Sequence, residues 1–167
     1  MRRRFNRENC SVARALEALG DWWTFLVVRE AFVGTRRFAD FEANLAISKN
    51  VLANRLARLT RHGVLQRVDA GVHGRRYEYV LSPKGKDLVT VLTALRQWGD
   101  RWMFGPGKEP LLVFDRRTGR VIPPVRVLDE AGVPLRSRDM EVRAGPGASK
   151  RTAARVTSRA SASKDPP

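Results

Sequence analysis

Hydrophobic residues recur every three or four positions through residues 11–62, a spacing typical of helices that bury one face. Four stretches follow this pattern and are predicted to be helices: 12–19 with Ser11 as its cap, 22–32, 39–45 and 48–62. Residues that favour helix ends support these limits, since Asp21 can cap the second helix and Gly63 can stop the fourth. On the fourth helix, Leu52, Leu56 and Leu59 form the predicted inner stripe.

The hydrophobic period changes after Gly63. Residues 64–68 and 77–81 have strand-like composition, and the glycine-containing segment between them predicts a hairpin. Ser82 and Pro83 then favour the start of a last helix, as its cap and in its first turn. That helix carries a wide apolar stripe: Leu88, Val91, Leu92, Leu95, Trp98 and Trp102. Helices followed by a hairpin and a helix indicate an α+β fold, the winged helix-turn-helix.

The composition changes twice more beyond the last predicted helix. Residues 105–143 lose helical periodicity and gain Pro and Gly, so we expect a small β-rich extension there. Residues 144–167 have almost nothing to bury, and we expect a disordered basic tail that either brushes DNA or has no specific role. The predicted organisation is a winged helix-turn-helix domain at 10–104, the extension at 105–143 and the tail at 144–167.

The chain is strongly basic. Its 167 residues contain 32 Lys and Arg against 17 Asp and Glu, a formal net charge of +15, which favours a polyanionic partner such as nucleic acid. One cysteine and two histidines exclude a disulfide framework and leave few metal or acid–base sites, so we expect no metal, no cofactor and no enzymatic activity. Without an apolar run near the length of a membrane span or a secretory signal, a cytoplasmic, nucleoid-associated protein is predicted.

The fourth predicted helix has the composition of a DNA-reading helix. No acid occurs from Ser48 to His62, whereas an exposed helix face ordinarily mixes both signs. Asn can bridge adenine, and Lys or Arg can read guanine or neutralise phosphate. The hairpin adds basic residues that can reach phosphates or the minor groove. The residues expected to contact DNA are Arg36, Ser48, Lys49, Asn50, Asn54, Arg55, Arg58, Arg75 and Arg76. The alternative interpretation is an ordinary solvated face.

A series of motifs covers residues 10–104: Cys10-Ser-Val-Ala-Arg-Ala-Leu, Leu19-Gly-Asp-Trp-Trp-Thr, Arg29-Glu-Ala-Phe, Arg36-Arg-Phe, Ile47-Ser-Lys-Asn-Val-Leu-Ala-Asn-Arg-Leu, Gly63-Val-Leu, Arg76-Tyr-Glu-Tyr-Val-Leu-Ser-Pro-Lys-Gly and Trp98-Gly-Asp-Arg-Trp. This series resembles the HxlR-type winged helix-turn-helix regulators of the MarR-like superfamily. The resemblance implies a homodimeric transcriptional regulator that pairs through its N-terminal segment and its last helix. It also implies that Arg75 and Arg76 belong to the wing, and that the recognition helix contains Ser48, Lys49, Asn50, Asn54 and Arg55. One departure is Ala39, where relatives often have a capping Ser or Asp.

The extension resembles a zinc-ribbon-like module of some longer relatives, with turns at 115–119 and 128–132. These turns lack the thiols that zinc requires, so we expect a metal-free unit. Cys10 is the one reactive candidate. The resemblance implies a sensor of oxidants or electrophiles, and a place beside a helix start favours the thiolate. The alternative is an inert cysteine packed at the dimer contact.

Two functional hypotheses remain. The leading hypothesis is a sequence-specific regulator of double-stranded DNA, acting as a homodimeric repressor on a nearby or divergent gene, with a small-molecule or electrophile effector. The alternative is a non-specific or architectural nucleic-acid-binding protein. A specific footprint that bulk DNA competes only weakly would separate them.

Overall fold

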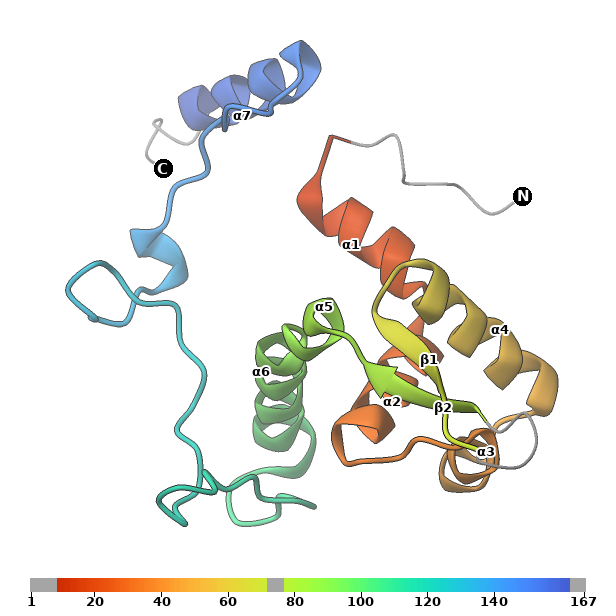
Figure 1. Ribbon diagram of the computed structural model, residues 1–167. Helices are drawn as coiled ribbons and strands as arrows, with labels where there is room; N and C mark the ends of the chain where they lie inside the picture. Colours follow the sequence, from red (N-terminus) through yellow and green to blue (C-terminus); the bar gives the residue numbers. More distant parts are fainter. Residues whose placement is uncertain (1–8, 72–76, 163–167) are drawn as a thin grey trace. The chain divides into compact units, whose positions relative to one another are not determined.

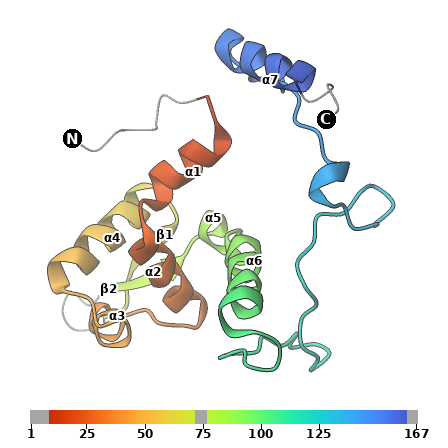
Figure 2. The same cartoon turned by 180° about the vertical axis from the view of Figure 1, so that it is seen from behind.

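The structure is a computed structural model that describes residues 9–71 and 77–162 of the chain. It forms two compact units: residues 18–125, and the residues up to Glu17 together with those from Arg126 onward. Figures 1 and 2 show the elements from opposite sides. They are α1 (Ser11–Leu19), α2 (Trp22–Phe32), α3 (Phe38–Leu45), α4 (Lys49–Arg61), β1 (Leu65–Asp69), β2 (Tyr77–Leu81), α5 (Pro83–Lys86), α6 (Val89–Gly99), η1 (Asp100–Phe104), η2 (Ser137–Asp139) and α7 (Lys150–Ala162).

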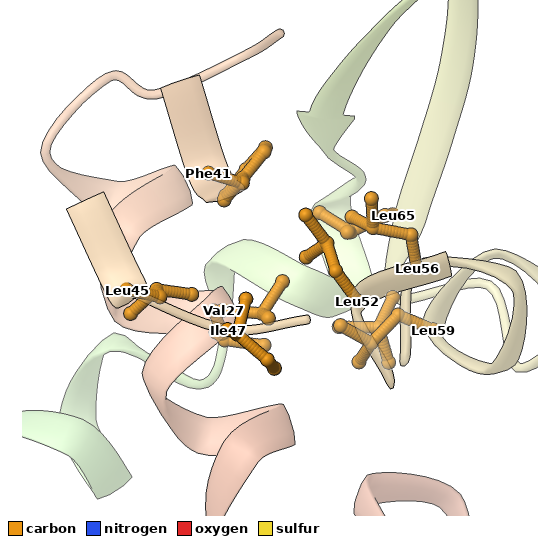
Figure 3. Packing of buried hydrophobic residues seen from close by; sticks show 10 residues of the cluster. Val27, Phe41, Leu45, Ile47, Leu52, Leu56, Leu59 and Leu65 are labelled. Carbon is orange, nitrogen blue, oxygen red and sulfur yellow. The ribbon is translucent and has the colours of Figure 1, made fainter. Parts of the chain in front are cut away.

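One hydrophobic core joins α2, α3, α4 and the hairpin. The predicted inner stripe of α4 is confirmed, since Leu52, Leu56 and Leu59 are fully buried. They pack with Val27 of α2 and Phe41 of α3, as Figure 3 shows. Burying a side chain of this size contributes about 1.5–3 kcal/mol. These contacts fix α4 by its apolar face and leave its opposite face outside the core.

Local signals set the ends of the helices as predicted. Asp21 caps α2, because its carboxylate accepts the backbone N–H of Thr24 at 3.3 Å. Gly63 has a φ of +69° and follows the end of α4, where the N–H of Val64 donates to the carbonyl of Leu59 at 2.9 Å. The cap of α3, in contrast, falls at Arg37 and not at Ala39, so the departure expected at Ala39 lies two residues inside the capping position.

The hairpin and α5 meet without room for a side chain. β1 and β2 pair antiparallel, with Leu65 opposite Leu81. Ser82 caps α5 as predicted: its hydroxyl accepts the N–H of Gly85 at 3.0 Å and donates to the carbonyl of Gly63 at 2.6 Å. A Cβ at Gly85 would lie 2.2 Å from the carbonyl oxygen of Val64. Only glycine fits there, so the start of the last helical segment is fixed against the hairpin.

The last predicted helix is interrupted. Residues 83–104 form a short helix α5, the helix α6 and a final turn of π-helix, η1. The apolar stripe divides accordingly: Leu88 and Leu92 pack against the core. The remaining positions are 49–61% exposed: Val91, Leu95, Trp98 and Trp102. The core is too small to cover the whole stripe, so one apolar face remains open.

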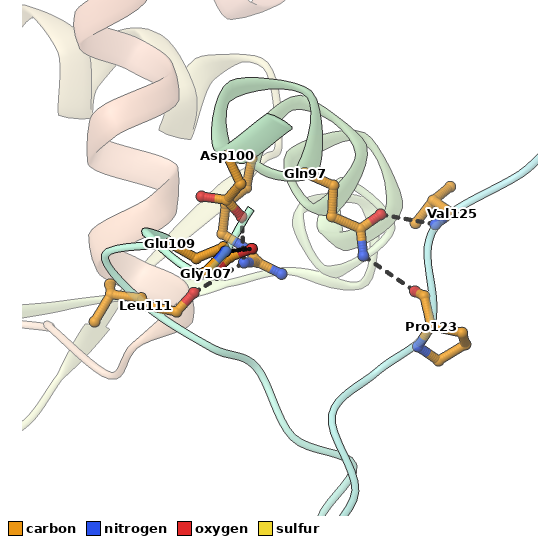
Figure 4. A network of polar contacts seen from close by, with 8 residues as sticks. Gln97, Asp100, Gly107, Glu109, Leu111, Pro123 and Val125 are labelled. Carbon is orange, nitrogen blue, oxygen red and sulfur yellow. Dashed lines mark hydrogen bonds and ion pairs between the residues drawn. The ribbon is translucent and has the colours of Figure 1, made fainter. Parts of the chain in front are cut away.

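Residues 105–125 are attached to α6 through polar contacts, shown in Figure 4. The amide of Gln97 acts as a fork: its Nε2 donates to the carbonyl of Pro123 at 3.0 Å, and its Oε1 accepts the N–H of Val125 at 2.7 Å. Arg96 donates to the carbonyl of Leu111 at 3.0 Å and pairs with Asp100 at 2.8 Å. The first part of the extension therefore belongs to the unit that carries the winged helix elements.

The extension has isolated bridges and turns. Phe114 bridges Val121, and Leu128 bridges Pro134. In the turn at 115–119, the carboxylate of Asp115 accepts the backbone N–H of Arg117 at 2.9 Å, and this bond together with the Arg117 guanidinium lowers the pKa of Asp115. The other turn is built in the same way: its Asp129 accepts the backbone N–H groups of Ala131 and Val133 at 3.0 and 2.7 Å. Each turn thus has its own internal acceptor.

Within residues 9–71 and 77–162, no helix is long and apolar enough to cross a membrane. In the same part of the chain, no group of three or more His, Cys, Asp or Glu side chains is placed to hold a metal ion.

Helix α7 occupies a segment for which composition led us to expect no regular structure. The hydroxyl of Ser149 accepts the N–H of Thr152 at 3.2 Å and so caps the helix. Asn9, far away in the sequence, accepts the N–H of Ser149 at 2.8 Å and donates to the carbonyl of Gly147 at 3.0 Å. Alanine and arginine also favour helix. The Ser149 cap, the hydrogen bonds from Asn9 and the helix propensity of the sequence therefore all stabilise α7.

Candidate DNA-binding interface

Helices α3 and α4 form the helix-turn-helix. The turn between them contains Ala46, whose φ of 48° and ψ of 40° lie in the left-handed region. Ala46 is the one non-glycine residue with positive φ among residues 9–71 and 77–162. Leu45 and Ile47 on either side are buried, so the turn is anchored in the core and holds α4 at a fixed angle to α3.

The outward face of α4 is polar, small and free of acids. Its exposed residues are Lys49, Asn50, Ala53, Asn54, Ala57 and Arg61. Ser48 precedes the helix and makes no capping hydrogen bond with its side chain. Ala53 and Ala57 were not among the predicted contacts, although their methyl groups permit a close approach of the helix and can touch thymine methyls. Helical spacing from Asn50 could have identified them.

Arg55 lies on the flank of α4 and binds within the protein. Its Nε donates to Oδ1 of Asp21 at 3.0 Å, and its Nη2 lies 2.5 Å from Oδ2. Both side chains are about one-fifth exposed, at 20% for Arg55 and 21% for Asp21. The geometry is two-pronged, the arrangement in which a guanidinium holds a carboxylate best. Arg55 therefore connects α4 to the start of α2.

Arg58, one turn further along α4, also points back to the protein. Its Nε donates to the carbonyl of Ala18 at 3.3 Å, at the C-terminal end of α1, where a cation is favoured by the helix dipole. Gly20 has a φ of +88°, and a Cβ there would lie 3.0 Å from the Arg58 Nε. The structure thus brings Arg55 and Arg58 together on the junction of α1 and α2 and leaves Asn50 and Asn54 on the exposed face.

The hairpin supplies basic residues beside α4. Its tip, with the predicted contacts Arg75 and Arg76, lies outside the described residues. On the described stem, the guanidinium of Arg67 stacks over the ring of Tyr77, 3.9 Å from its centre. Arg67 is not among the contacts predicted from the sequence, although its position on the same face as Tyr77 follows from strand alternation.

Arg36 lies at the outer edge of β2. Its carbonyl accepts the backbone N–H of Tyr79 at 2.8 Å, which fixes the segment before α3 to β2. Glu78 holds the side chains of Arg36 and Arg37 at 3.8 and 3.6 Å, while both arginines remain more than half exposed. Arg36 is therefore held beside the hairpin with its charge open to solvent.

A buried carboxylate locks α2 to α3. Glu30 is 8% exposed. Its Oε2 accepts hydrogen bonds from Asn44 at 3.0 Å and Thr35 at 3.2 Å, and its Oε1 pairs with Arg29 at 2.8 Å. Because every oxygen of the carboxylate has a donor, this charge is tolerated in a largely buried place. The contacts keep the first helix of the motif at a fixed position.

Cys10 lies just before α1. Its carbonyl accepts the backbone N–H of Arg14 at 3.0 Å, and the residue is exposed. It lines a hollow together with Gly147, in the segment that leads to α7, and Thr152, in the first turn of α7. In the single chain the thiol is therefore open to solvent.

A helix-turn-helix with an acid-free outer face and a basic hairpin beside it defines a winged helix DNA-binding protein. The chain belongs to the HxlR-like helix-turn-helix family, whose profile matches residues 18–105. It is therefore a DNA-binding transcriptional regulator of the helix-turn-helix type, as its resemblance predicted.

Known relatives support this assignment along most of the chain. The chain is 36% identical over 140 residues to an uncharacterized HTH-type transcriptional regulator of Mycobacterium tuberculosis, across 84% of this chain and 89% of that protein. It is similar to the crystal structure of PA1607, a candidate transcription factor, with 38% identity and a TM-score of 0.77 over 84% of this chain and 98% of that one. PA1374 of Pseudomonas aeruginosa is 36% identical, with a TM-score of 0.61 over 87% and 99% of the two chains.

Proposed function

We propose that this protein is a sequence-specific repressor that binds a double-stranded DNA operator as a homodimer. The observation that carries the proposal is that some polar side chains of α4 contact the protein while others are exposed. Its flank cations Arg55 and Arg58 contact the protein, whereas Asn50 and Asn54 remain exposed on a face without acids. A helix face that exposes amides and small side chains is better suited to hydrogen bonding with base edges than to neutralising phosphate charge alone.

Roles follow from residue chemistry. Asn50 and Asn54 read base edges in the major groove, and the methyl groups of Ala53 and Ala57 allow the helix to approach them. Ser48 and Lys49 contact phosphate at the helix N-terminus, where backbone N–H groups also favour an anion. The phosphate contacts of the hairpin side come from Arg36, Arg67, Arg75 and Arg76. Arg55 and Arg58 act as positioning residues that hold α4 at its docking angle.

The homodimer is supported by the open apolar face of α6 and η1. Leu95, Trp98 and Trp102 are 51–61% exposed, and aromatic residues concentrated on one helix face are typical of an interface core. A second copy of the same face would cover them. Two recognition helices would then read two half-sites of one operator.

The effector is proposed to act through Cys10 or through a non-covalent ligand. An exposed thiol beside a helix start is accessible to an electrophile, and it is the single thiol of the chain. A charged or bulky adduct there would alter the N-terminal segment. Release of the operator would follow, which is the behaviour of a repressor with a chemical inducer.

The decisive experiment is recovery of genomic fragments bound by the full-length protein, followed by footprinting of the most enriched fragment. The proposal expects one protected operator with two half-sites, and weak competition by bulk DNA. Uniform protection that bulk DNA competes equally would instead support the non-specific, architectural alternative. Transcription from the bound promoter, with and without the protein, decides between repression and activation.

A further inference from the structure

Among the side chains of α7 that the structure describes, three cations are exposed: Lys150, Arg151 and Arg155. None of them forms an ion pair with another residue in the part of the chain that the structure describes. Two acids of the same unit pair with arginines next to them in the sequence, Asp139 with Arg138 at 3.9 Å and Glu141 with Arg143 at 2.7 Å. Among the described residues, no ion pair therefore neutralises these three cations of α7.

The cations lie on a defined face. Arg151 and Arg155 are one helical turn apart, and the helix contains no acid to separate them. Thr152, Ala153 and Val156 are partly buried on a different side. Like charges one turn apart repel each other, so an anion against this face favours the helix.

The start of α7 is also held in place. Asn9 clamps the segment before it through Gly147 and Ser149, and its carbonyl accepts the hydroxyl of Thr152 at 3.4 Å. A helix that is capped, clamped and cationic on one face presents its charges in a fixed pattern. This pattern fits a regularly charged polymer better than a small anion.

We propose that α7 is a second DNA-contacting element, in which Lys150, Arg151 and Arg155 bind phosphates of the duplex that flanks the operator. The inference rests on the proposed function, because the winged helix domain brings the duplex within reach of the tethered helix. The contacts are to phosphate and carry no sequence information, since α7 has no amide side chain to read a base edge.

The test compares the full-length protein with the variant Lys150→Gln, Arg151→Gln, Arg155→Gln. Affinity is measured against salt on random duplexes of about two and about four helical turns, roughly 20 and 40 base pairs. Each lost phosphate contact lowers the slope of log affinity against log salt by about 0.9, so the variant should lose up to ~3 per protomer on the longer duplex. Its preference for the operator should be unchanged.

A matched control removes the same charge from arginines that are already paired: Arg117→Gln, Arg138→Gln, Arg143→Gln. This control should keep the wild-type slope, as should Arg151→Lys, Arg155→Lys, which retains the charge. Equal loss in the control would overturn the inference and indicate a general charge effect. An unchanged slope in the α7 variant, with loss of binding to vesicles of phosphatidylglycerol, would overturn it in favour of a membrane surface. The salt slope on random duplex does not depend on an operator. A protein without any operator preference would therefore refute the proposed function, while the slope would still show whether α7 contacts DNA.

Discussion

Arg55 of α4 and Asp21 of the α1–α2 junction form a two-pronged ion pair, with atoms 3.0 and 2.5 Å apart. The same Asp21 carboxylate accepts the backbone N–H of Thr24 and so caps α2. One side chain therefore performs two tasks, starting one helix and holding another. The pair sets the position of α4, the candidate recognition helix, relative to the start of α2.

Loss of this carboxylate should destabilise the fold. Asp21→Ala removes the cap and leaves Arg55 without its partner, so the free energy of unfolding should fall by about 2–3 kcal/mol. Asp21→Asn keeps a capping oxygen and should cost less. A double-mutant cycle with Arg55→Gln, measured by urea unfolding, should give a coupling of about 1 kcal/mol. Additive effects would show that the pair does not act as a unit.

Asn50→Ala should relax the choice of operator. Removal of a paired amide contact costs about 1–3 kcal/mol of discrimination at one or two base pairs. Arg67→Ala, on the stem of the hairpin, should instead weaken binding to all sequences to a similar extent, since phosphate contacts carry no sequence information. Affinities across a panel of single-base operator variants check both. The same profile for the two variants would contradict the assigned roles.

Ala46→Gly should leave the free energy of unfolding unchanged or raise it by up to about 1 kcal/mol. The gain comes from relief of the left-handed conformation, which costs a side chain about 1–2 kcal/mol, and glycine's greater unfolded-state freedom offsets part of it. The matched control is Ala43→Gly on the exposed side of α3, where the same change should cost about 1 kcal/mol. In chemical denaturation, Ala46→Gly should show a gain or no change and Ala43→Gly a loss, and equal losses would be inconsistent with the turn geometry.

Leu95→Glu should produce a folded monomer. Leu95 is 51% exposed on the apolar face of α6, so a charge there leaves the core intact and is buried only when a second copy covers it. Sedimentation should show a shift from dimer to monomer together with weaker operator binding. Val33→Glu, at a position 72% exposed beyond the end of α2, serves as the control and should stay dimeric. A wild-type protein that is monomeric at micromolar concentration would refute the dimer.

Cys10→Ser separates the two candidate effector mechanisms. If an electrophile acts on the thiol, release of the operator by a quinone or aldehyde should occur in the wild type and disappear in Cys10→Ser. The measurement is operator binding by both proteins, with and without the electrophile. Equal release from both would eliminate thiol sensing and point to a non-covalent ligand.

Short-range patterns predicted most of the winged helix domain. The inner stripe of α4, the cap at Asp21 and the glycine stop at Gly63 each depend on residues within a few positions of one another, so the sequence specifies them locally. The family followed from the same stretch, because its motifs lie on these elements. The composition of the α4 face likewise indicated DNA binding.

Tertiary structure decided which of the basic residues are committed to the fold. Arg55 and Arg58 looked equivalent to Asn50 and Asn54 in sequence, yet their partners lie 34 and 40 residues away and became apparent only when α4 packed on the α1–α2 junction. The helix α7 depends on Asn9, 140 residues from Ser149. A helix period fixes which side is apolar but not which polar flank meets another element, because that depends on contacts between distant segments of the chain.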